Sequence, residues 1–250
     1  MKLRQSDPTG RGRRLRSTPS FRWDLLLKVG GSLGRSTALR PLLQRIALLA
    51  HRRRLLVVPG GGAFAELVRD QMSRLRIDEK TAHHMALLAM DQYGLLLSSL
   101  SRRSTGVDNL RAAELVAEAG RVPILLTASL IQREPGLERS FRLTSDSIAA
   151  FLAGRLRAAH LILLKSVRKP AERIRDRASA EALARRGIVD PLFPEMLPPN
   201  TTAWVLCGRR PQDLDRFMPV GPRAAARGRG AGFRNRTVPR SRREGLRGTT

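Results

Sequence analysis

Two lysines lie where a positively charged side chain is unfavourable. Lys28 is inside an apolar run at 25–29, and Lys165 ends a second apolar run at 161–165. An ammonium at the edge of a buried strand needs an anion or a carboxylate beside it. Because only five of the 47 basic residues are lysines, these two positions indicate a need for a compact ammonium that neutralises a transferring phosphoryl group. The alternative is that both lysines extend from strand ends into solvent.

Two predicted strands, at 25–29 and 55–58, each end in a run of glycines. The glycines are Gly30 and Gly31 after the first strand and Gly60, Gly61 and Gly62 after the second. Glycine lets the backbone approach a ligand closely, and the helix that follows offers free N–H groups to an anion. The two runs therefore predict a phosphate-binding site, with tight turns as the alternative. The spacing GxGxxG is absent at the first run, and GxxxxGK(S/T) does not occur.

Hydroxyl side chains and one carboxylate stand at the start of a predicted helix at 146–157. They are Thr144, Ser145, Asp146 and Ser147. Ser145 or Ser147 can supply the N-cap of that helix, and the residues alone favour this interpretation. Because the cluster comes just before the strand of Lys165, Asp146 is also placed where it could orient one or both ammonium groups.

Strand-like and helix-like segments alternate along the chain. The predicted strands are 25–29, 55–58, 122–126, 161–165 and 203–206, and the predicted helices are 37–51, 63–75, 79–100, 146–157 and 179–187. Such alternation is typical of an α/β protein in which helices cover both faces of a parallel sheet. Ligands bind at the carboxyl ends of the strands in such sheets, and the glycines and lysines described above lie at those ends.

A net charge of +26 suggests an anionic partner, but its distribution weakens that inference. Residues 1–22 and 223–250 carry +6 and +8, and both segments are predicted to be disordered tails that flank a domain at 23–222. A nucleic-acid-binding protein is the rival hypothesis. Aromatic residues make up only 4% of the chain, and helix-turn-helix, zinc and RNP signatures are absent. We therefore expect any nucleic-acid binding to be non-specific and to use the tails.

Several other classes of protein are excluded. The single cysteine, Cys207, rules out a disulfide framework and a cysteine-based zinc site. No apolar run approaches the roughly 18 residues that a membrane span needs. The expectation is a cytoplasmic protein that does not bind membranes, and we predict no metal site made of protein side chains.

The ordered set of motifs resembles the amino acid kinase superfamily. Three segments carry this resemblance: 28–33 (KVGGSL), 58–65 (VPGGGAFA) and 144–150 (TSDSIAA). Three more look like the methanofuran-biosynthesis branch of that superfamily: 82–94 (AHHMALLAMDQYG), 164–167 (LKSV) and 187–194 (GIVDPLFP). The resemblance covers roughly residues 25–207 and leaves out both tails. It implies a three-layer α/β/α sandwich around a mainly parallel sheet of about eight strands.

The resemblance also implies a reaction. An ATP- and Mg²⁺-dependent kinase would phosphorylate a small-molecule phosphate acceptor, here the phosphate of an aminomethylfuran methyl phosphate. UMP, acetylglutamate or a similar acceptor is the alternative. Where relatives have an Asp-Val-Asp-Gly-like turn, this chain has KSVRKP at 165–170, so the nucleotide contacts after Lys165 stay open. A homo-oligomer is expected, and Asp91, Gln92 and Tyr93 would lie in its interface or line the acceptor pocket, with the interface favoured.

Each motif residue receives a role from the same resemblance. Lys28 would hold the transferring phosphoryl group, Asp146 would orient the lysines, and Lys165 would contact the nucleotide phosphates. The phosphate would also be bound by Gly30, Gly31 and Ser32. The residues that would border the acceptor are Gly60, Gly61, Gly62, Thr144 and Ser145.

Overall fold

The computed structural model describes residues 21–167 and 172–218. The predicted tails at 1–22 and 223–250 lie outside these residues, except for Phe21 and Arg22. Phe21 is buried and packs against Trp23, with 4.6 Å between the ring centroids. Ordered packing is thus already present at residue 21.

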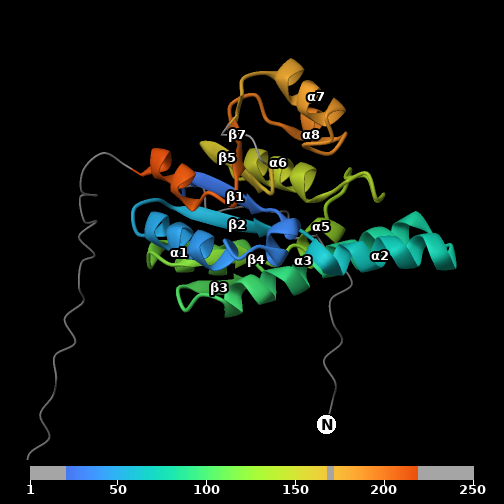
Figure 1. Cartoon of the computed structure of the whole chain (residues 1–250), viewed down its shortest axis with the longest axis horizontal. Helices are drawn as coiled ribbons and strands as arrows, with labels where there is room; N and C mark the ends of the chain where they lie inside the picture. The colour runs from blue at the N-terminus through green and yellow to red at the C-terminus, as the bar shows by residue number, and fades with distance from the viewer. Residues whose placement is uncertain (1–20, 168–171, 219–250) are drawn as a thin grey trace, which may run out of the picture. The chain divides into compact units, whose positions relative to one another are not determined.

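Seven strands of the described residues form one sheet, one fewer than the number expected. They are β1 (Leu25–Val29), β2 (Leu55–Pro59), β3 (Ser104–Val107), β4 (Val122–Leu125), β5 (His160–Lys165), β6 (Glu172–Ile174) and β7 (Thr202–Cys207). The order across the sheet is β3-β4-β2-β1-β5-β7-β6 (Figure 1). Neighbouring strands are parallel except for β6, which pairs antiparallel with β7. The predicted α/β class and mainly parallel sheet are confirmed.

Helices cover both faces of this sheet, which gives three layers (Figure 1). They are α1 (Leu39–Ala50), α2 (Gly62–Leu75), α3 (Glu79–Ser99), α4 (Leu110–Glu118), α5 (Ala128–Gln132), α6 (Ser145–Arg155), α7 (Arg177–Arg185) and α8 (Phe193–Met196), with the 3₁₀ helices η1 (Gly31–Arg35) and η2 (Pro211–Phe217). Residues of α1 and η2 pack on one face, and residues of α4, α5, α6, α7 and α8 pack on the other. The five helices predicted from the sequence are confirmed to within about two residues at each end.

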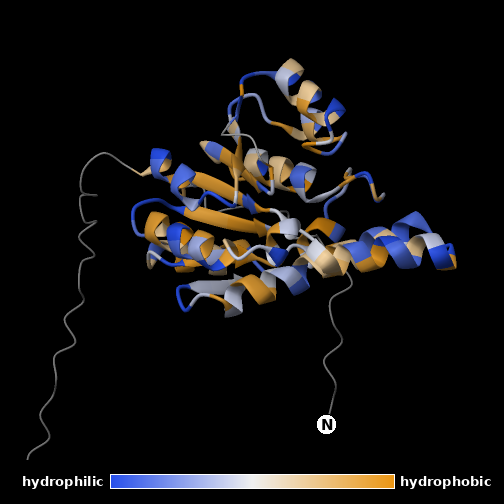
Figure 2. Cartoon of the chain, viewed as in Figure 1, coloured by the Kyte–Doolittle hydropathy of each residue, from blue (hydrophilic) through white to orange (hydrophobic). Residues whose placement is uncertain are grey.

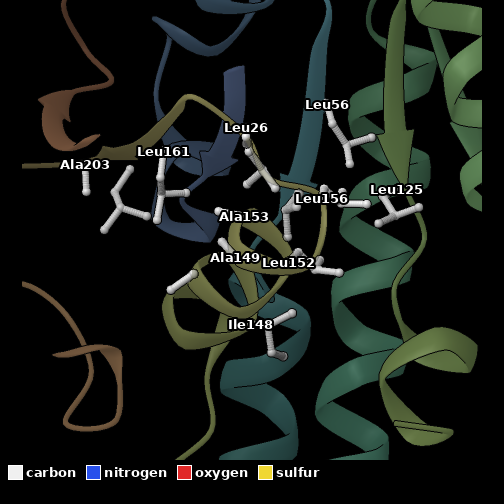
Figure 3. Packing of buried hydrophobic residues seen from close by; sticks show 14 of the residues in the cluster. Leu26, Leu56, Leu125, Ile148, Ala149, Leu152, Ala153, Leu156, Leu161 and Ala203 are labelled. Atoms are coloured by element: carbon white, nitrogen blue, oxygen red, sulfur yellow. The ribbon is translucent and has the colours of Figure 1, made fainter. Parts of the chain in front are cut away.

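Alternate residues of the central strands pack against opposite helix layers, because successive side chains of a strand point to opposite faces. Leu26 belongs to the core that includes α6, whereas Leu25 and Leu27 belong to the core that includes α1. Figure 3 shows Leu26 and Leu161 of two adjacent strands beside the residues of α6. The strands are therefore apolar on both faces, and Figure 2 shows them as the most hydrophobic layer of the fold.

Strand β1 lies at the point where the chain changes direction across the sheet. It pairs with β2 on one side and with β5 on the other, so Val29 is opposite both Pro59 and Leu164. Ligands of open parallel sheets bind at such a switch point, outside the carboxyl ends of the strands. The two glycine runs and Lys165 follow or end these three strands, so the topology brings them to one edge. In the part of the chain that is described, no helix has the length and apolar character needed to cross a membrane.

Candidate active site

A buried carboxylate lies between the ammonium groups of two lysines. Asp146, in the first turn of α6, is only 3% exposed. Its Oδ1 is 2.8 Å from the Nζ of Lys28 on β1, and its Oδ2 is 2.5 Å from the Nζ of Lys165 at the end of β5. The three side chains that the sequence analysis selected as the catalytic set therefore meet. We call this group the charged triad.

The electrostatics of the charged triad are set by burial and by the short distances. Burial raises the pKa of Asp146, but the positive charges of Lys28 and Lys165 outweigh it, so the pKa lies below its ordinary value. Burial, followed by the like charge of Lys28, lowers the pKa of Lys165. With all three groups ionised, the triad carries two positive charges and one negative charge. The excess positive charge is suited to an anion.

The ammonium of Lys165 has a second partner in the chain, the backbone carbonyl of Ile188. An ammonium has three N–H donors. Among the described residues, the contacts with Asp146 and Ile188 leave one of these donors for a ligand.

The two glycine runs touch each other backbone to backbone. A Cβ on Gly31 would lie 2.0 Å from the backbone nitrogen of Gly62, and one on Gly60 would lie 2.6 Å from the nitrogen of Gly31. A Cβ on Gly30 would lie 2.7 Å from the carbonyl oxygen of Leu164 on β5. Gly62 also has a φ of +58°, which favours glycine. The close packing of the two turns thus explains why these positions are glycine, which agrees with the tight-turn alternative. The turns also lie beside the charged triad, because Gly31, Gly61 and Gly62 line the same cavity.

A cavity of about 270 Å³ opens beside the charged triad. Its lining comes from the triad, the glycine runs, α2, α3 and the segment at 141–148. The predicted site residues that line it are Lys28, Gly31, Ser32, Gly61, Gly62, Thr144, Ser145, Asp146 and Lys165. Gly30 and Gly60 lie instead where the turns contact each other. The other walls are mixed: Leu87, Met90, Leu143 and Ile148 are apolar, whereas Glu66, Arg69 and His83 are polar or charged.

Ser32 connects the first glycine turn to the end of β5. Its hydroxyl is 2.9 Å from the hydroxyl of Ser166, and either oxygen can be the donor. The residue after Lys165 thereby touches the segment that was predicted to bind phosphate.

The start of α6 is capped by a residue that the sequence analysis did not select. Asp190 is 8% exposed, and its Oδ2 accepts a hydrogen bond of 3.0 Å from the backbone N–H of Ser147. The expectation that Ser145 or Ser147 supplies the N-cap is therefore wrong. Thr144 occupies the N-cap position without capping through its own side chain, and its hydroxyl donates to Asp190 over 2.6 Å. The only sequence signal for Asp190 was its place in the segment at 187–194.

Two polar residues of α3 also have partners inside the chain. Asp91 accepts hydrogen bonds from the backbone N–H groups of Thr127, at 2.6 Å, and Ala128, at 3.2 Å, and so caps α5. Tyr93 is buried, and its hydroxyl is 3.4 Å from the carbonyl oxygen of Gly30. Neither these two residues nor Gln92 lines the cavity beside the charged triad, so the expectation that they line the acceptor pocket is wrong. The favoured expectation, that this part of α3 lies in a subunit interface, stays a prediction.

The comparisons with known proteins agree with this geometry. Residues 25–169 match the model of the amino acid kinase family. The chain is similar to a [5-(aminomethyl)furan-3-yl]methyl phosphate kinase from Methanocaldococcus jannaschii, with 26% identity over 195 residues, which span 75% of this chain and 89% of the relative.

Solved structures of similar fold include uridylate kinases. The enzyme from Archaeoglobus fulgidus superposes with a TM-score of 0.56 at 19% identity, over 75% of this chain and 92% of the other. The UMP kinase from Ureaplasma parvum gives 0.54 at 14% identity, over 75% and 90%. At these identities the likeness concerns the fold.

Proposed function

This chain belongs to the amino acid kinase family and is a phosphotransferase, and on that premise we propose a specific reaction. The phosphoryl donor is ATP, and the acceptor is the phosphate of an aminomethylfuran methyl phosphate. The observation that carries the proposal is the cavity beside the charged triad, because it joins a cluster of excess positive charge to an apolar part of the wall at Leu87, Met90, Leu143 and Ile148. A small ring that bears a phosphate matches both parts.

The residues divide into two roles in this proposal. Lys28 and Lys165 neutralise the negative charge of the transferring phosphoryl group and of its neighbours, while Asp146 holds the two ammonium groups at fixed positions. The backbone at Gly31 and Ser32 borders the same space, and the absence of a side chain on Gly31 lets the second glycine run pack directly against it. The lining residues Gly61, Gly62, Thr144 and Ser145 contact the acceptor.

The transfer itself requires one bond to form and one to break. An oxygen of the acceptor phosphate attacks the γ-phosphorus of ATP, and the bond between that phosphorus and the β–γ bridging oxygen breaks, so ADP leaves with the electron pair. The acceptor phosphate is already ionised near neutral pH, because its second pKa is about 6. No side chain therefore has to remove a proton, and catalysis depends on alignment and on positive charge.

The size and the walls of the cavity support a compact acceptor. Its volume of about 270 Å³ is just below the roughly 300–1,000 Å³ that is usual for ligand pockets. The similar protein from Methanocaldococcus jannaschii is named for an aminomethylfuran phosphate. Both points favour the furan phosphate over UMP.

Magnesium, the oligomer and the compartment complete the proposal. Mg²⁺ would be held by phosphate oxygens and water, and it would neutralise phosphate charge. The glycine backbone that borders the cavity and the two lysines beside it fit such a nucleotide. We also propose a cytoplasmic homo-oligomer, for which exposed leucines on α2 and α3, such as Leu67 and Leu88, offer apolar contact surface.

An ADP-release assay with ATP and Mg²⁺ tests the proposal. The acceptors are the aminomethylfuran methyl phosphate, UMP, carbamate and acetylglutamate, each supplied to the full chain. We expect turnover with the furan phosphate alone, and a loss of several orders of magnitude in kcat for Lys28→Ala with folding intact. Lys80→Ala removes an exposed lysine outside the cavity and is the matched control. Turnover of UMP or acetylglutamate alone would reject the proposed acceptor, and near-normal activity of Lys28→Ala would reject the role of the triad.

A further inference from the structure

Asp190 is a buried acidic residue to which the proposed reaction gives no role. It lies between α7 and α8. Its two carboxylate oxygens accept hydrogen bonds from the hydroxyl of Thr144, the backbone N–H and hydroxyl of Ser147, and the backbone N–H groups of Leu192 and Phe193. A buried carboxylate with this many donors is held in one position.

These hydrogen bonds join two segments that are distant in sequence. Leu192 and Phe193 are at the start of α8, directly after Asp190, whereas Thr144 and Ser147 are at the start of α6. Asp146 lies between the last two residues in the sequence. Asp190 therefore holds residues on both sides of the carboxylate that binds the two lysines, through the side chain of Thr144 and through the backbone and side chain of Ser147.

The loop of Asp190 reaches the charged triad a second time. The carbonyl oxygen of Ile188, two residues before Asp190, accepts a hydrogen bond from the ammonium of Lys165. One loop thus holds Asp146 through the start of α6 and Lys165 directly. The negative charge of Asp190 also acts on Lys165, where it favours the protonated form in the same sense as Asp146.

We propose that Asp190 is a positioning residue for phosphoryl transfer, which sets the places of Asp146 and Lys165 without contacting the substrates. This inference rests on the proposed function. Asp190 does not belong to the lining of the cavity, so its effect has to pass through its neighbours. A displacement of about 1 Å in a catalytic group can reduce a rate roughly 100-fold, so a small shift of α6 would suffice.

The chain offers a matched control for the test. Asp91 is a partly buried carboxylate that also accepts hydrogen bonds from two backbone N–H groups at the start of a helix, but it does not contact the charged triad. Asp190→Asn and Asp91→Asn remove the same charge from the same kind of cap. We compare both full-length variants with the wild type in thermal unfolding, kcat and the KM values for ATP and the acceptor.

For Asp190→Asn, we expect kcat to fall on the order of 100-fold while both KM values change less than about threefold. For Asp91→Asn, we expect a smaller loss of thermal stability, because Asp91 has two donors and is less buried, and a kcat within about threefold of the wild type. If both variants lose the same fraction of kcat, or if neither loses activity, Asp190 is only structural and the inference is wrong. Ser147→Ala, which removes one hydroxyl donor to Asp190, gives the second test if Asp190→Asn does not fold. It should lower kcat several-fold at unchanged KM, and an unchanged kcat overturns the inference.

A readout without turnover separates this inference from the proposed function. Because the chain has only five lysines, ¹³C-lysine labelling gives a simple NMR spectrum, and Lys165→Arg assigns the signal of Lys165. The charged groups that act on this ammonium are Lys28, Asp146 and Asp190. Asp190→Asn should lower the titration midpoint of Lys165 relative to both the wild type and Asp91→Asn. An unmoved midpoint overturns the inference, whereas an inactive wild type with a shifted midpoint overturns only the proposed function.

Discussion

Replacing Asp146 with asparagine tests whether the charged triad holds together as a unit. The amide keeps the shape of the carboxylate but removes the negative charge between Lys28 and Lys165. The side chain of Asp146 is 5% exposed, that of Lys28 is 7% exposed and that of Lys165 is 18% exposed, so water screens their charges poorly. The variant therefore leaves two ammonium groups close together and unpaired in a largely buried site.

The expected loss of stability follows from this burial. Breaking a buried ion pair by removing one partner costs about 3–5 kcal/mol, because the remaining charge is left uncompensated. With a urea m-value near 2 kcal/mol per molar, the unfolding midpoint of Asp146→Asn should fall by about 2 M. Adding Lys28→Met should recover part of this loss, since it removes one of the unpaired charges at similar length. Both variants should be catalytically inactive.

Urea unfolding followed by the fluorescence of the two tryptophans, Trp23 and Trp204, measures these midpoints. The pH dependence gives an independent check. Since the folded-state pKa of Asp146 is lowered, its stabilisation is present above the unfolded value of about 3.9 and is lost as the pH falls through the folded value. The stability difference between wild type and Asp146→Asn should therefore shrink below about pH 4. A difference that is absent at pH 7, or additive losses in the double variant, would refute the reasoning.

Three further predictions concern the glycine turns, the lysine at the end of β5 and the tails. Gly31→Ala should lower kcat on the order of 100-fold and destabilise the fold by about 1–3 kcal/mol, because the added Cβ would lie 2.0 Å from the backbone nitrogen of Gly62. An unchanged kcat and an unchanged melting temperature would contradict this prediction. Burial lowers the pKa of Lys165. As the pH rises, kcat should therefore begin to decline before the ordinary lysine pKa of 10.5 is reached. Between the folded and the unfolded pKa of Lys165 the unfolded chain binds more protons, so the stability contributed by this group should rise with pH there. A kcat that stays constant up to pH 10.5 would argue against a protonated Lys165. In electrophoretic mobility shifts, nucleic-acid binding should weaken steeply with salt and disappear when residues 1–22 and 223–250 are deleted. Phosphoryl transfer should survive that deletion, and salt-resistant binding by the truncated chain would revive the rival hypothesis.

The sequence carries enough information to place the charged triad. Lys28 and Lys165 are conspicuous because they stand in apolar runs, and Asp146 starts the helix before the second run. Parallel strands bring their carboxyl ends to one edge, so the elements alone bring these residues close together. The individual roles in catalysis stay predictions.

Other parts of the site depend on contacts that no local pattern encodes. Asp190 caps α6 from 43 residues away, and the polar residues at 144–147 favoured a local cap instead. The edge strands β3 and β6 were missed for a related reason. The strand at 104–107 is only partly buried and the strand at 172–174 has three residues, so neither shows the apolar run of a central strand.

The position of β1 between β2 and β5 has a consequence for the nascent chain. The ribosome completes β2 soon after β1, but β5 begins only at His160, roughly 130 residues after β1 ends. At 5–20 residues per second, one edge of β1 stays unpaired for on the order of ten seconds. An unpaired apolar edge invites association with other chains, and a charged residue within the strand opposes it. Lys28, the proposed catalytic cation, is therefore also expected to oppose aggregation of the nascent chain until its carboxylate partner has been synthesised.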